Sequence, residues 1–143
     1  MNCDFCESED VKRRTIIKDD KAFAFLTHIP LTKGHMIVCP LRHVLTYEEM
    51  TDEEKSATEE MRLKIKGILI KVFGAEGFNY AWNEQKIAGQ SISHFHLHIV
   101  PRKKGDTEVL KFEPREFLYG SVPRNKSPEE ELLEVVELVK KNL

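Results

Sequence analysis

The chain has little net charge, few cysteines and no long apolar run. Its 22 basic and 24 acidic side chains leave a net charge of −2, which gives no electrostatic reason to expect binding to nucleic acids or membrane surfaces. Three cysteines argue against a disulfide scaffold and favour thiol or metal chemistry. No stretch approaches the ~20 apolar residues of a membrane span, and the acidic start MNCDFCESED lacks the apolar segment of a signal peptide. We therefore expect a cytoplasmic protein.

The remaining composition is that of a globular protein of one domain. The 143 residues are 41% hydrophobic and 32% charged. A chain of this length can bury roughly two thirds of its unfolded surface, which is enough for a proper core. We expect a single domain over residues 1–143, with the core in 1–102 and an irregular segment followed by a C-terminal helix in 103–143.

Apolar patterning predicts both strands and helices. Thr51 and Glu54 form a capping-box pattern, and the apolar spacing behind them predicts a helix of about 22 residues, or roughly 33 Å. Gly74 stands where that helix should end. Ser127 and Glu130 form a second capping box for the C-terminal helix, with proline at the first helical position. The predicted strands cover residues 15–18, 22–26, 35–40, 78–83 and 94–100.

These elements indicate an α+β fold. Hairpin connections outnumber strand–helix–strand units, so we expect a mostly antiparallel sheet with the long helix on one face. Cys39 should be a small core residue of the third strand. Trp82 is expected to lie in the core rather than to stack on a nucleobase.

Three histidines alternate with apolar residues in SHFHLHIVPR, residues 93–102. On a strand, His94, His96 and His98 would share one face, with neighbours ~6.6 Å apart and the outer pair ~13 Å apart. A zinc–nitrogen bond is only about 2.1 Å long, so a single three-histidine zinc site from this strand is disfavoured and divided roles are expected. A neutral imidazole can attack an electrophile or move a proton. The alternative is a row of plain surface histidines.

The loop before the histidines carries polar groups. Gly89, Gln90 and Ser91 can present N–H groups and a hydroxyl to an anion, although the same triplet could be an ordinary turn. Asn83 stands on the other side of the loop, where it could also be a turn residue.

These motifs together resemble one family. QSISHFHLHIVPR, residues 90–102, resembles the signature of the histidine-triad superfamily of nucleotide hydrolases and transferases, His-φ-His-φ-His-φ-φ, where φ is apolar. KGHMIVCPLRH, residues 33–43, looks like the family's Gly-His-φ-φ-φ-φ-Pro-Lys/Arg-x-His strand. CDFC, residues 3–6, looks like the Cys-x-x-Cys opening of the zinc-carrying members. Pro101 and Arg102 look like the dinucleoside-polyphosphate hydrolase side of the family.

The resemblance implies a catalytic role for each histidine after the first. His96 would attack the α-phosphate and form a nucleotidyl-histidine, which water or another acceptor then releases. His98 would hydrogen-bond a non-bridging phosphate oxygen, with His35 behind it. Ser91 would contact the phosphate or the leaving group.

The resemblance also implies substrate-binding residues. Gln90 would contact the phosphate or leaving group, and Asn83 the phosphates or ribose, with Arg102 as a further binding residue. Thr27 stands where many members carry an aspartate that binds the ribose hydroxyls. A hydroxyl makes fewer and weaker hydrogen bonds than a carboxylate, so this departure bears on nucleoside affinity.

His94, the first histidine of the motif, is expected to be a ligand of a structural zinc site. The resemblance supplies Cys3, Cys6, His43 and His94 as ligands, a Cys₂His₂ set of the closed tetrahedral type. Cys-x-x-Cys could also be a redox pair, although no βαβ context supports that, or two unrelated cysteines. No organic cofactor is expected.

The expected function is hydrolysis, or nucleotidyl transfer, at the α-phosphate of a nucleotide conjugate. A dinucleoside polyphosphate is the leading substrate, and a purine nucleoside phosphoramidate is the alternative. Two other classes remain open: a metalloenzyme with catalytic zinc, and a non-catalytic nucleotide-binding module. The resemblance implies a homodimer, with the long helix and a strand at the interface. The net charge of −2 gives no reason to expect a nucleic-acid or membrane partner.

Overall fold

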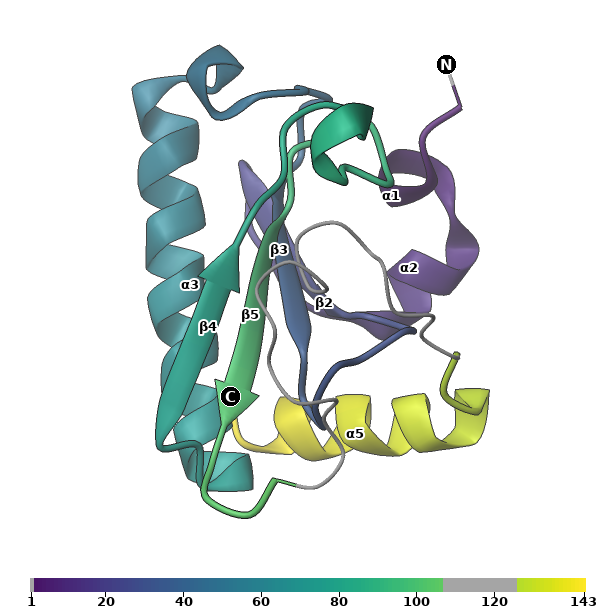
Figure 1. Ribbon diagram of the computed structural model, residues 1–143, viewed down its shortest axis with the longest axis vertical. Helices are drawn as coiled ribbons and strands as arrows, with labels where there is room; N and C mark the ends of the chain where they lie inside the picture. Colours follow the sequence, from purple (N-terminus) through teal and green to yellow (C-terminus); the bar gives the residue numbers. More distant parts are fainter. Residues whose placement is uncertain (1, 107–125) are drawn as a thin grey trace.

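An antiparallel sheet forms the centre of the molecule (Figure 1). The computed structural model describes residues 2–106 and 126–143. Its five strands lie in the order β1-β2-β3-β5-β4, and every neighbouring pair is antiparallel. The strands are β1 (Thr15–Lys18), β2 (Ala22–Leu26), β3 (Met36–Pro40), β4 (Gly77–Ala81) and β5 (Leu97–Arg102). The predicted antiparallel α+β architecture is therefore confirmed.

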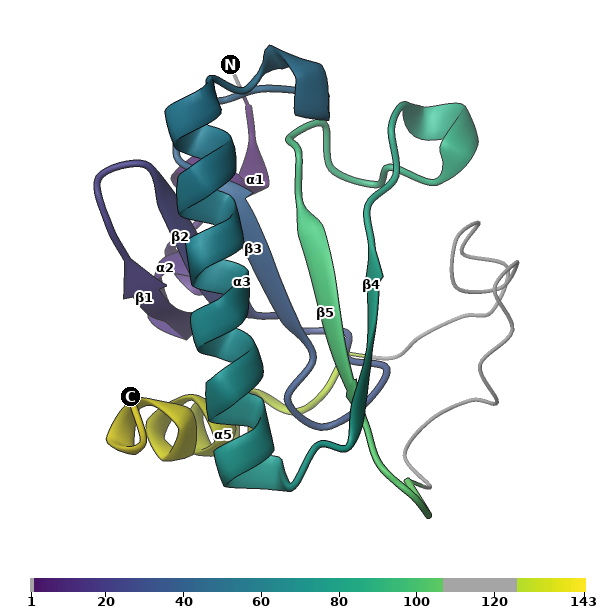
Figure 2. The same ribbon diagram turned by 90° about the vertical axis from the view of Figure 1, so that its left-hand side faces the viewer.

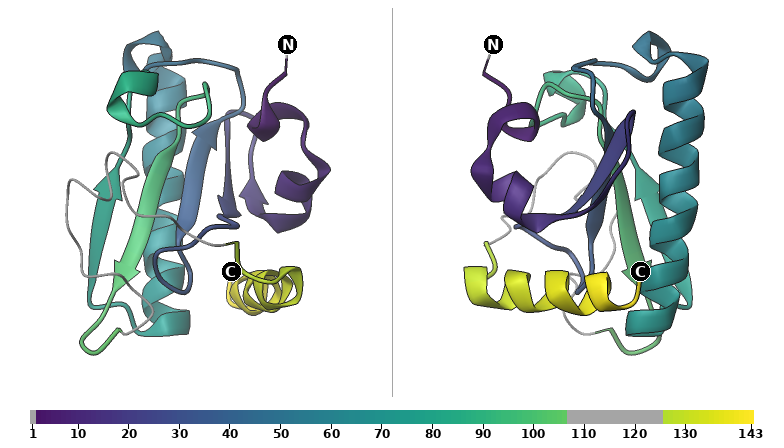
Figure 3. Two further views of the ribbon diagram at one scale, coloured as in Figure 1. Left: turned by 45° about the vertical axis from the view of Figure 1, so that its right-hand side comes forward. Right: turned by 180° about the vertical axis from the view of Figure 1, so that it is seen from behind.

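Helices cover the sheet unequally. The long helix α3 (Asp52–Phe73) runs along one face, as Figure 2 shows. The short helices α1 (Asp4–Glu7) and α2 (Glu9–Arg14) lie on the other side of the sheet, and α5 (Glu129–Lys141) crosses near one end of it (Figure 3). Two single-turn 3₁₀ helices, η1 (Tyr47–Glu49) and η2 (Lys86–Ala88), lie in the connections. Within the described ranges, no helix is long and apolar enough to cross a membrane.

Alternation along the strands creates two apolar clusters. On one face, Met61, Ile65 and Leu69 of α3 pack on the sheet in the larger cluster. The smaller cluster contains Val11, Phe23, Phe25, Ile37 and Cys39. Cys39 is buried, as predicted, and burial raises the pKa of its thiol well above the ordinary value. Three members of the smaller cluster, Val11, Phe25 and Ile37, also line the cavity described below.

The long helix has the predicted ends but only half of the predicted capping box. The hydroxyl of Thr51 accepts a hydrogen bond from the N–H of Glu54 at 3.1 Å, and Gly74 ends the helix with a φ of 66°. The carboxylate of Glu54 instead accepts from Nε of Arg42 at 2.9 Å. The Glu54 carboxylate is thus directed to Arg42 rather than back to the backbone N–H of Thr51.

The second predicted capping box is wrong. Helix α5 begins at Glu129 with Pro128 at the N-cap and no side-chain cap. Ser127 precedes the cap, and its N–H donates to the carbonyl of His28 at 3.0 Å. This contact holds the chain in front of α5 beside the loop that follows β2.

Two strand boundaries also differ from the prediction. Strand β4 ends at Ala81, and β5 begins at Leu97, so His94 and His96 precede the strand. A local turn bonds the N–H of His94 to the carbonyl of Ile92, and Phe95 donates to the carbonyl of Val44 at 2.7 Å. These bonds take the place of a strand ladder. The irregular segment predicted to precede the C-terminal helix within 103–143 falls largely on 107–125, outside the described residues.

Trp82 is not a core residue. Its side chain is 43% exposed, because it follows the end of β4 and lies against Tyr47 with ring centroids 5.4 Å apart. Its indole N–H donates to Glu84.

Candidate active site and metal centre

His96 presents an unprotonated ring nitrogen. Its Nδ1 lies 2.8 Å from the backbone carbonyl of His94. A carbonyl oxygen only accepts hydrogen bonds, so Nδ1 carries the proton of the neutral ring and Nε2 keeps its lone pair. The ring is 5% exposed, and this burial lowers the pKa of His96 below its ordinary value. The neutral, nucleophilic form is therefore favoured.

His98 carries its proton on the opposite ring nitrogen, Nε2. The N–H of Leu31 donates to Nδ1 of His35 at 3.1 Å, so the proton of a neutral His35 ring sits on Nε2. That nitrogen lies 3.0 Å from Nδ1 of His98 and donates to it. A neutral His98 must then carry its own proton on Nε2. The structure thus places His35 behind His98, and the pair orients a hydrogen-bond donor rather than a base.

Both histidines line one cavity of about 580 Å³, which we call the triad pocket. Ser91 and Asn83 line the same cavity from the loop before β5. The side-chain amide of Asn83 donates to the carbonyl of Gly89 at 3.2 Å, which ties the two ends of this loop together. Apolar wall is provided by Phe25, Ile37 and Leu132, among others.

Thr27 lines the triad pocket beside His28, at the end of β2. The Thr27 side chain is 3% exposed, and its hydroxyl accepts from the N–H of Ile29 at 3.3 Å. The bond from Ile29 uses part of the acceptor capacity of the Thr27 hydroxyl and does not use its proton.

Two predicted binding residues do not line the triad pocket. Gln90 is 4% exposed and uses both ends of its amide inside the protein, accepting from the N–H of Gln85 at 2.9 Å and donating to the carbonyl of Leu45 at 3.0 Å. It braces the loop instead. Gln85 itself has a positive φ of 72°, so the bond from Gln90 also helps hold an unfavourable backbone conformation.

Arg102 lies at a different cavity, of about 260 Å³. Its guanidinium pairs with Asp106 at 2.9 Å and donates to the side-chain oxygen of Asn79 at 3.0 Å. The hydrogen bond from Arg102 lowers the pKa of the Asp106 carboxyl. In this arrangement the guanidinium holds the turn after β5 and does not point into the triad pocket.

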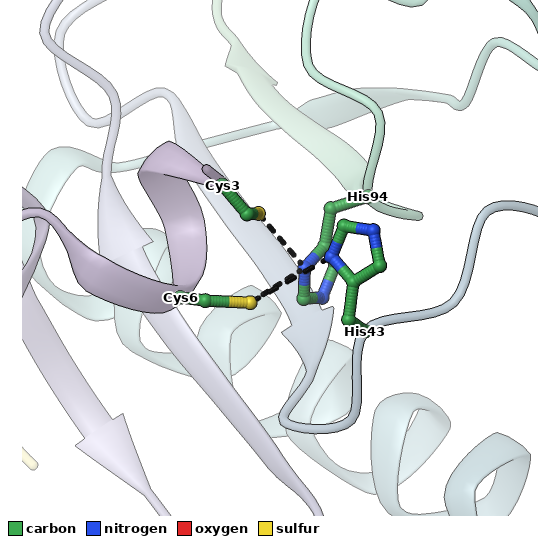
Figure 4. Close-up of side chains that lie close together, drawn as sticks. All are labelled: Cys3, Cys6, His43 and His94. Atoms are coloured by element: carbon green, nitrogen blue, oxygen red, sulfur yellow. Dashed lines mark hydrogen bonds between the residues drawn. The ribbon is translucent and has the colours of Figure 1, made fainter. Parts of the chain in front are cut away.

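The two cysteines of the N-terminal motif meet two histidines from distant parts of the chain (Figure 4). Sγ of Cys3 and of Cys6 lie 3.5 and 3.4 Å from Nδ1 of His94. Sγ of Cys6 lies 3.7 Å from Nδ1 of His43. All four ligand atoms lie within 4.8 Å of one another. We call these residues the cysteine–histidine cluster.

The geometry of this cluster fits a tetrahedral zinc ion. Zinc bonds of about 2.3 Å to sulfur and 2.0–2.1 Å to nitrogen give sulfur–nitrogen edges of about 3.6 Å, close to the distances observed. Nε2 of His94 donates to the carbonyl of Pro40 at 2.8 Å, which leaves Nδ1 unprotonated toward the cysteines. Burial also lowers the pKa of His94, which favours the neutral ring that a metal ligand requires.

Phe5 was not among the predicted site residues. Phe5 stands between the two cysteines and lines the triad pocket. Its ring lies edge-on to His96, with centroids 5.0 Å apart at an interplanar angle of 81°. The only signal in the sequence is that the Cys-x-x-Cys motif encloses an aromatic residue.

Comparison with known proteins agrees with this arrangement. A sequence model of the HIT domain matches residues 8–105. An uncharacterised HIT-like protein of Methanocaldococcus jannaschii is 35% identical over 77% of this chain and 86% of its own length. The bis(5'-adenosyl)-triphosphatase of Dictyostelium discoideum is 32% identical over 75% of this chain and 68% of its own length. The adenosine 5'-monophosphoramidase hnt1 of Schizosaccharomyces pombe is 33% identical over 71% and 75%.

Solved structures share the fold. A zinc-bound histidine triad family protein from Mycobacterium smegmatis superposes with a TM-score of 0.70 at 25% identity. The alignment covers 99% of this chain and 95% of that one. The match therefore includes the regions that carry both the triad pocket and the cysteine–histidine cluster.

Proposed function

This chain belongs to the HIT domain family, and from that premise we propose that it hydrolyses a nucleotide conjugate, or transfers its nucleotidyl group, at the α-phosphate. One observation carries the proposal: the same pocket holds an unprotonated Nε2 on His96 and a protonated Nε2 on His98. A nucleophile and a hydrogen-bond donor side by side are what attack on a phosphate requires.

The reaction proceeds in two displacements. Nε2 of His96 forms a bond to the α-phosphorus while the bond to the leaving group breaks, and the electron pair goes with the leaving group. The carbonyl of His94 stabilises the positive charge on the imidazole through the Nδ1 hydrogen. His98 donates to a non-bridging oxygen throughout. Water then attacks the phosphorus while the phosphorus–Nε2 bond breaks and returns its electron pair to His96. The attacking water loses a proton, and the nucleoside monophosphate is released.

Ser91 acts at the leaving group in this proposal. Its hydroxyl belongs to the loop on the pocket's edge and is exposed, so it can donate to the departing oxygen or nitrogen. A polyphosphate leaves readily as an anion, whereas an amine must gain a proton before it departs. The leaving group thus decides how much Ser91 contributes.

A dinucleoside polyphosphate is the leading substrate, and a purine nucleoside phosphoramidate is the alternative. The pocket volume of about 580 Å³ suits a nucleotide, and Phe25 and Ile37 offer apolar wall to a base. The ending Pro101-Arg102 and the Dictyostelium triphosphatase favour the polyphosphate. The fission-yeast phosphoramidase favours the alternative. We further propose that Thr27 binds the ribose, with fewer hydrogen bonds than a carboxylate would make.

Structural zinc bound by the cysteine–histidine cluster is also part of the proposal. The spacing of the four ligand atoms and the zinc-bound relative support it. When bound, zinc supplies a cross-link between the N-terminus, the segment after β3 and the turn before β5. The chemistry at phosphorus belongs to the side chains of the triad pocket.

A homodimer is supported by the exposed side of α3 and β4. Strand β4 is an edge of the sheet, and the cationic side chains of Arg62 and Lys66 on α3 lie over its Tyr80 and Phe78 rings. Leu63 and Ile70 of α3 are 52% and 46% exposed, and Tyr80 of β4 is 38% exposed. Analytical ultracentrifugation should give twice the chain mass, and Leu63→Glu with Ile70→Glu should give the monomer.

The test of function is a panel of diadenosine tri- and tetraphosphate and adenosine phosphoramidate, with release of nucleoside monophosphate as the readout. The parent should turn over at least one class, and His96→Asn should abolish turnover while nucleotide binding is preserved. A His96→Asn protein with ordinary rates would refute the mechanism. A parent that binds nucleotide but never turns over any conjugate would favour a non-catalytic binding module.

A further inference from the structure

Phe5 is held in place by a very short segment. It lies in α1, a helix of four residues whose N-cap is Cys3 and which contains Cys6. A single helical turn is not stable alone in water. The side chains of Cys3 and Cys6 both face His94 (Figure 4), so a metal bound there would fix both ends of the turn that carries Phe5.

The Phe5 ring in turn contacts the nucleophile. Its centroid lies 5.0 Å from that of His96 and 5.2 Å from that of Phe25. His96 also contacts the ring of His98, with centroids 4.9 Å apart and an angle of 71°. The imidazole of His96 thus contacts two rings, each inclined steeply to it.

The two rings that contact His96, those of Phe5 and His98, are held by different means. His98 lies on a central strand and is fixed by the hydrogen bond from His35. Phe5 lies on α1 rather than on a strand, and its position depends on the cysteine turn and on packing against the smaller cluster, which includes Phe25. The hydrogen bond from Nδ1 to the His94 carbonyl is one contact, so it leaves the ring plane of His96 to be set by its neighbours.

We propose that Phe5 is a positioning residue that couples the metal centre to the nucleophile. With metal bound, residues 3–6 hold Phe5 against His96, and Nε2 points into the triad pocket. Without metal, Phe5 withdraws, His96 loses its fixed orientation, and nucleotidyl transfer slows although the sheet and pocket persist. The inference rests on the proposed role of His96. It means that metal loading regulates how fast His96 reacts.

A ring-resonance experiment tests the coupling without any substrate. The ring protons of His96, assigned by their loss in His96→Asn, are followed in zinc-loaded and chelator-treated protein. Because an aromatic ring shifts nearby protons, chelation should move the His96 signals, and Phe5→Leu should move them similarly with zinc still bound. In Phe5→Leu, chelation should then cause little further shift of the His96 signals. A chelation shift as large in Phe5→Leu as in the parent would overturn the proposal, as would unchanged His96 signals in zinc-loaded Phe5→Leu.

Kinetics provide the second readout. Zinc-loaded Phe5→Leu should lose about 10- to 100-fold in kcat, since small misplacements of reacting groups are costly, with KM and zinc content close to the parent. Phe5→Tyr keeps the ring and should restore most of the rate. Phe23→Leu is the matched control, because Phe23 stacks on Phe25 but does not line the triad pocket, and it should retain the parent kcat.

Failure of the proposed coupling through Phe5 can be told apart from failure of the proposed function. Loss of zinc from Phe5→Leu would show that Phe5 serves the metal site itself, and an unchanged kcat in that variant would remove the coupling. If the parent showed no turnover on any conjugate, the proposed function would fail, while the His96 resonances would still decide whether metal acts on this ring through Phe5.

Discussion

Nε2 of His35, the residue just before β3, lies 3.0 Å from Nδ1 of His98 on the neighbouring strand β5. Ile37 pairs with His98, so His35, two residues earlier, lies on the same face. His35 is fully buried, and its other nitrogen accepts from the N–H of Leu31. A backbone donor thus sets the proton position on two successive imidazoles and makes His98 a donor at the pocket.

Replacement of His35 should slow the reaction without affecting the metal. In His35→Leu, Nδ1 of His98 loses its donor, and the tautomer that directs an N–H at the phosphate is no longer enforced. Supporting partners of this kind typically contribute 10- to 100-fold, so we expect turnover to fall by about that factor with zinc content unchanged. His35→Gln can still donate and should recover part of the loss. Parent-like turnover in His35→Leu would show that the relay has no role.

The cysteine–histidine cluster should hold about one zinc per chain. Cys6→Ser should lose it and, because metal binding contributes to the free energy of folding, should lower Tm by about 10 °C or more. Metal content is measured by elemental analysis and Tm by circular dichroism. Cys39→Ala is the matched thiol control, since Cys39 is buried in the smaller cluster, and it should keep its zinc. Native protein free of zinc, or zinc retained by Cys6→Ser, would contradict the assignment.

The two predicted helix caps should differ in energy. Thr51→Ala removes the acceptor for the Glu54 N–H and should lower the free energy of unfolding by about 1 kcal/mol. Ser127→Ala should change it by much less, because Ser127 lies before the N-cap and no side chain caps α5. Urea denaturation of the two variants compares them directly. Equal losses would mean that Ser127 has a capping role that the fold does not show.

Local patterns predicted much of the fold. The strand at Ala22–Leu26 and the helix at Asp52–Phe73 have the expected bounds, since apolar alternation and caps act within a few residues. The errors arise from distant contacts. Val44 bonds the N–H of Phe95 and delays the start of β5, and Arg42 takes the carboxylate of Glu54. Neither partner can be identified from the local sequence.

The candidate site was likewise predicted where motifs identify its residues and not where distant contacts place them. The alternating histidines and the motif resemblance brought together the four residues that the structure places in the cysteine–histidine cluster. The internal bonds of Gln90 to Leu45 and Gln85 depend on how the loop folds, so its expected phosphate contact was assigned from the motif alone. The contact of Phe5 with His96 depends on how α1 packs against the turn before β5, so the local sequence does not predict it.

The most direct test of the central claim is mass spectrometry of acid-quenched or slowly hydrolysing reactions. The account predicts a peptide carrying His96 whose mass has increased by one nucleotidyl group, absent from His96→Asn. Turnover with no such adduct, or an adduct on another residue, would contradict nucleophilic attack by His96.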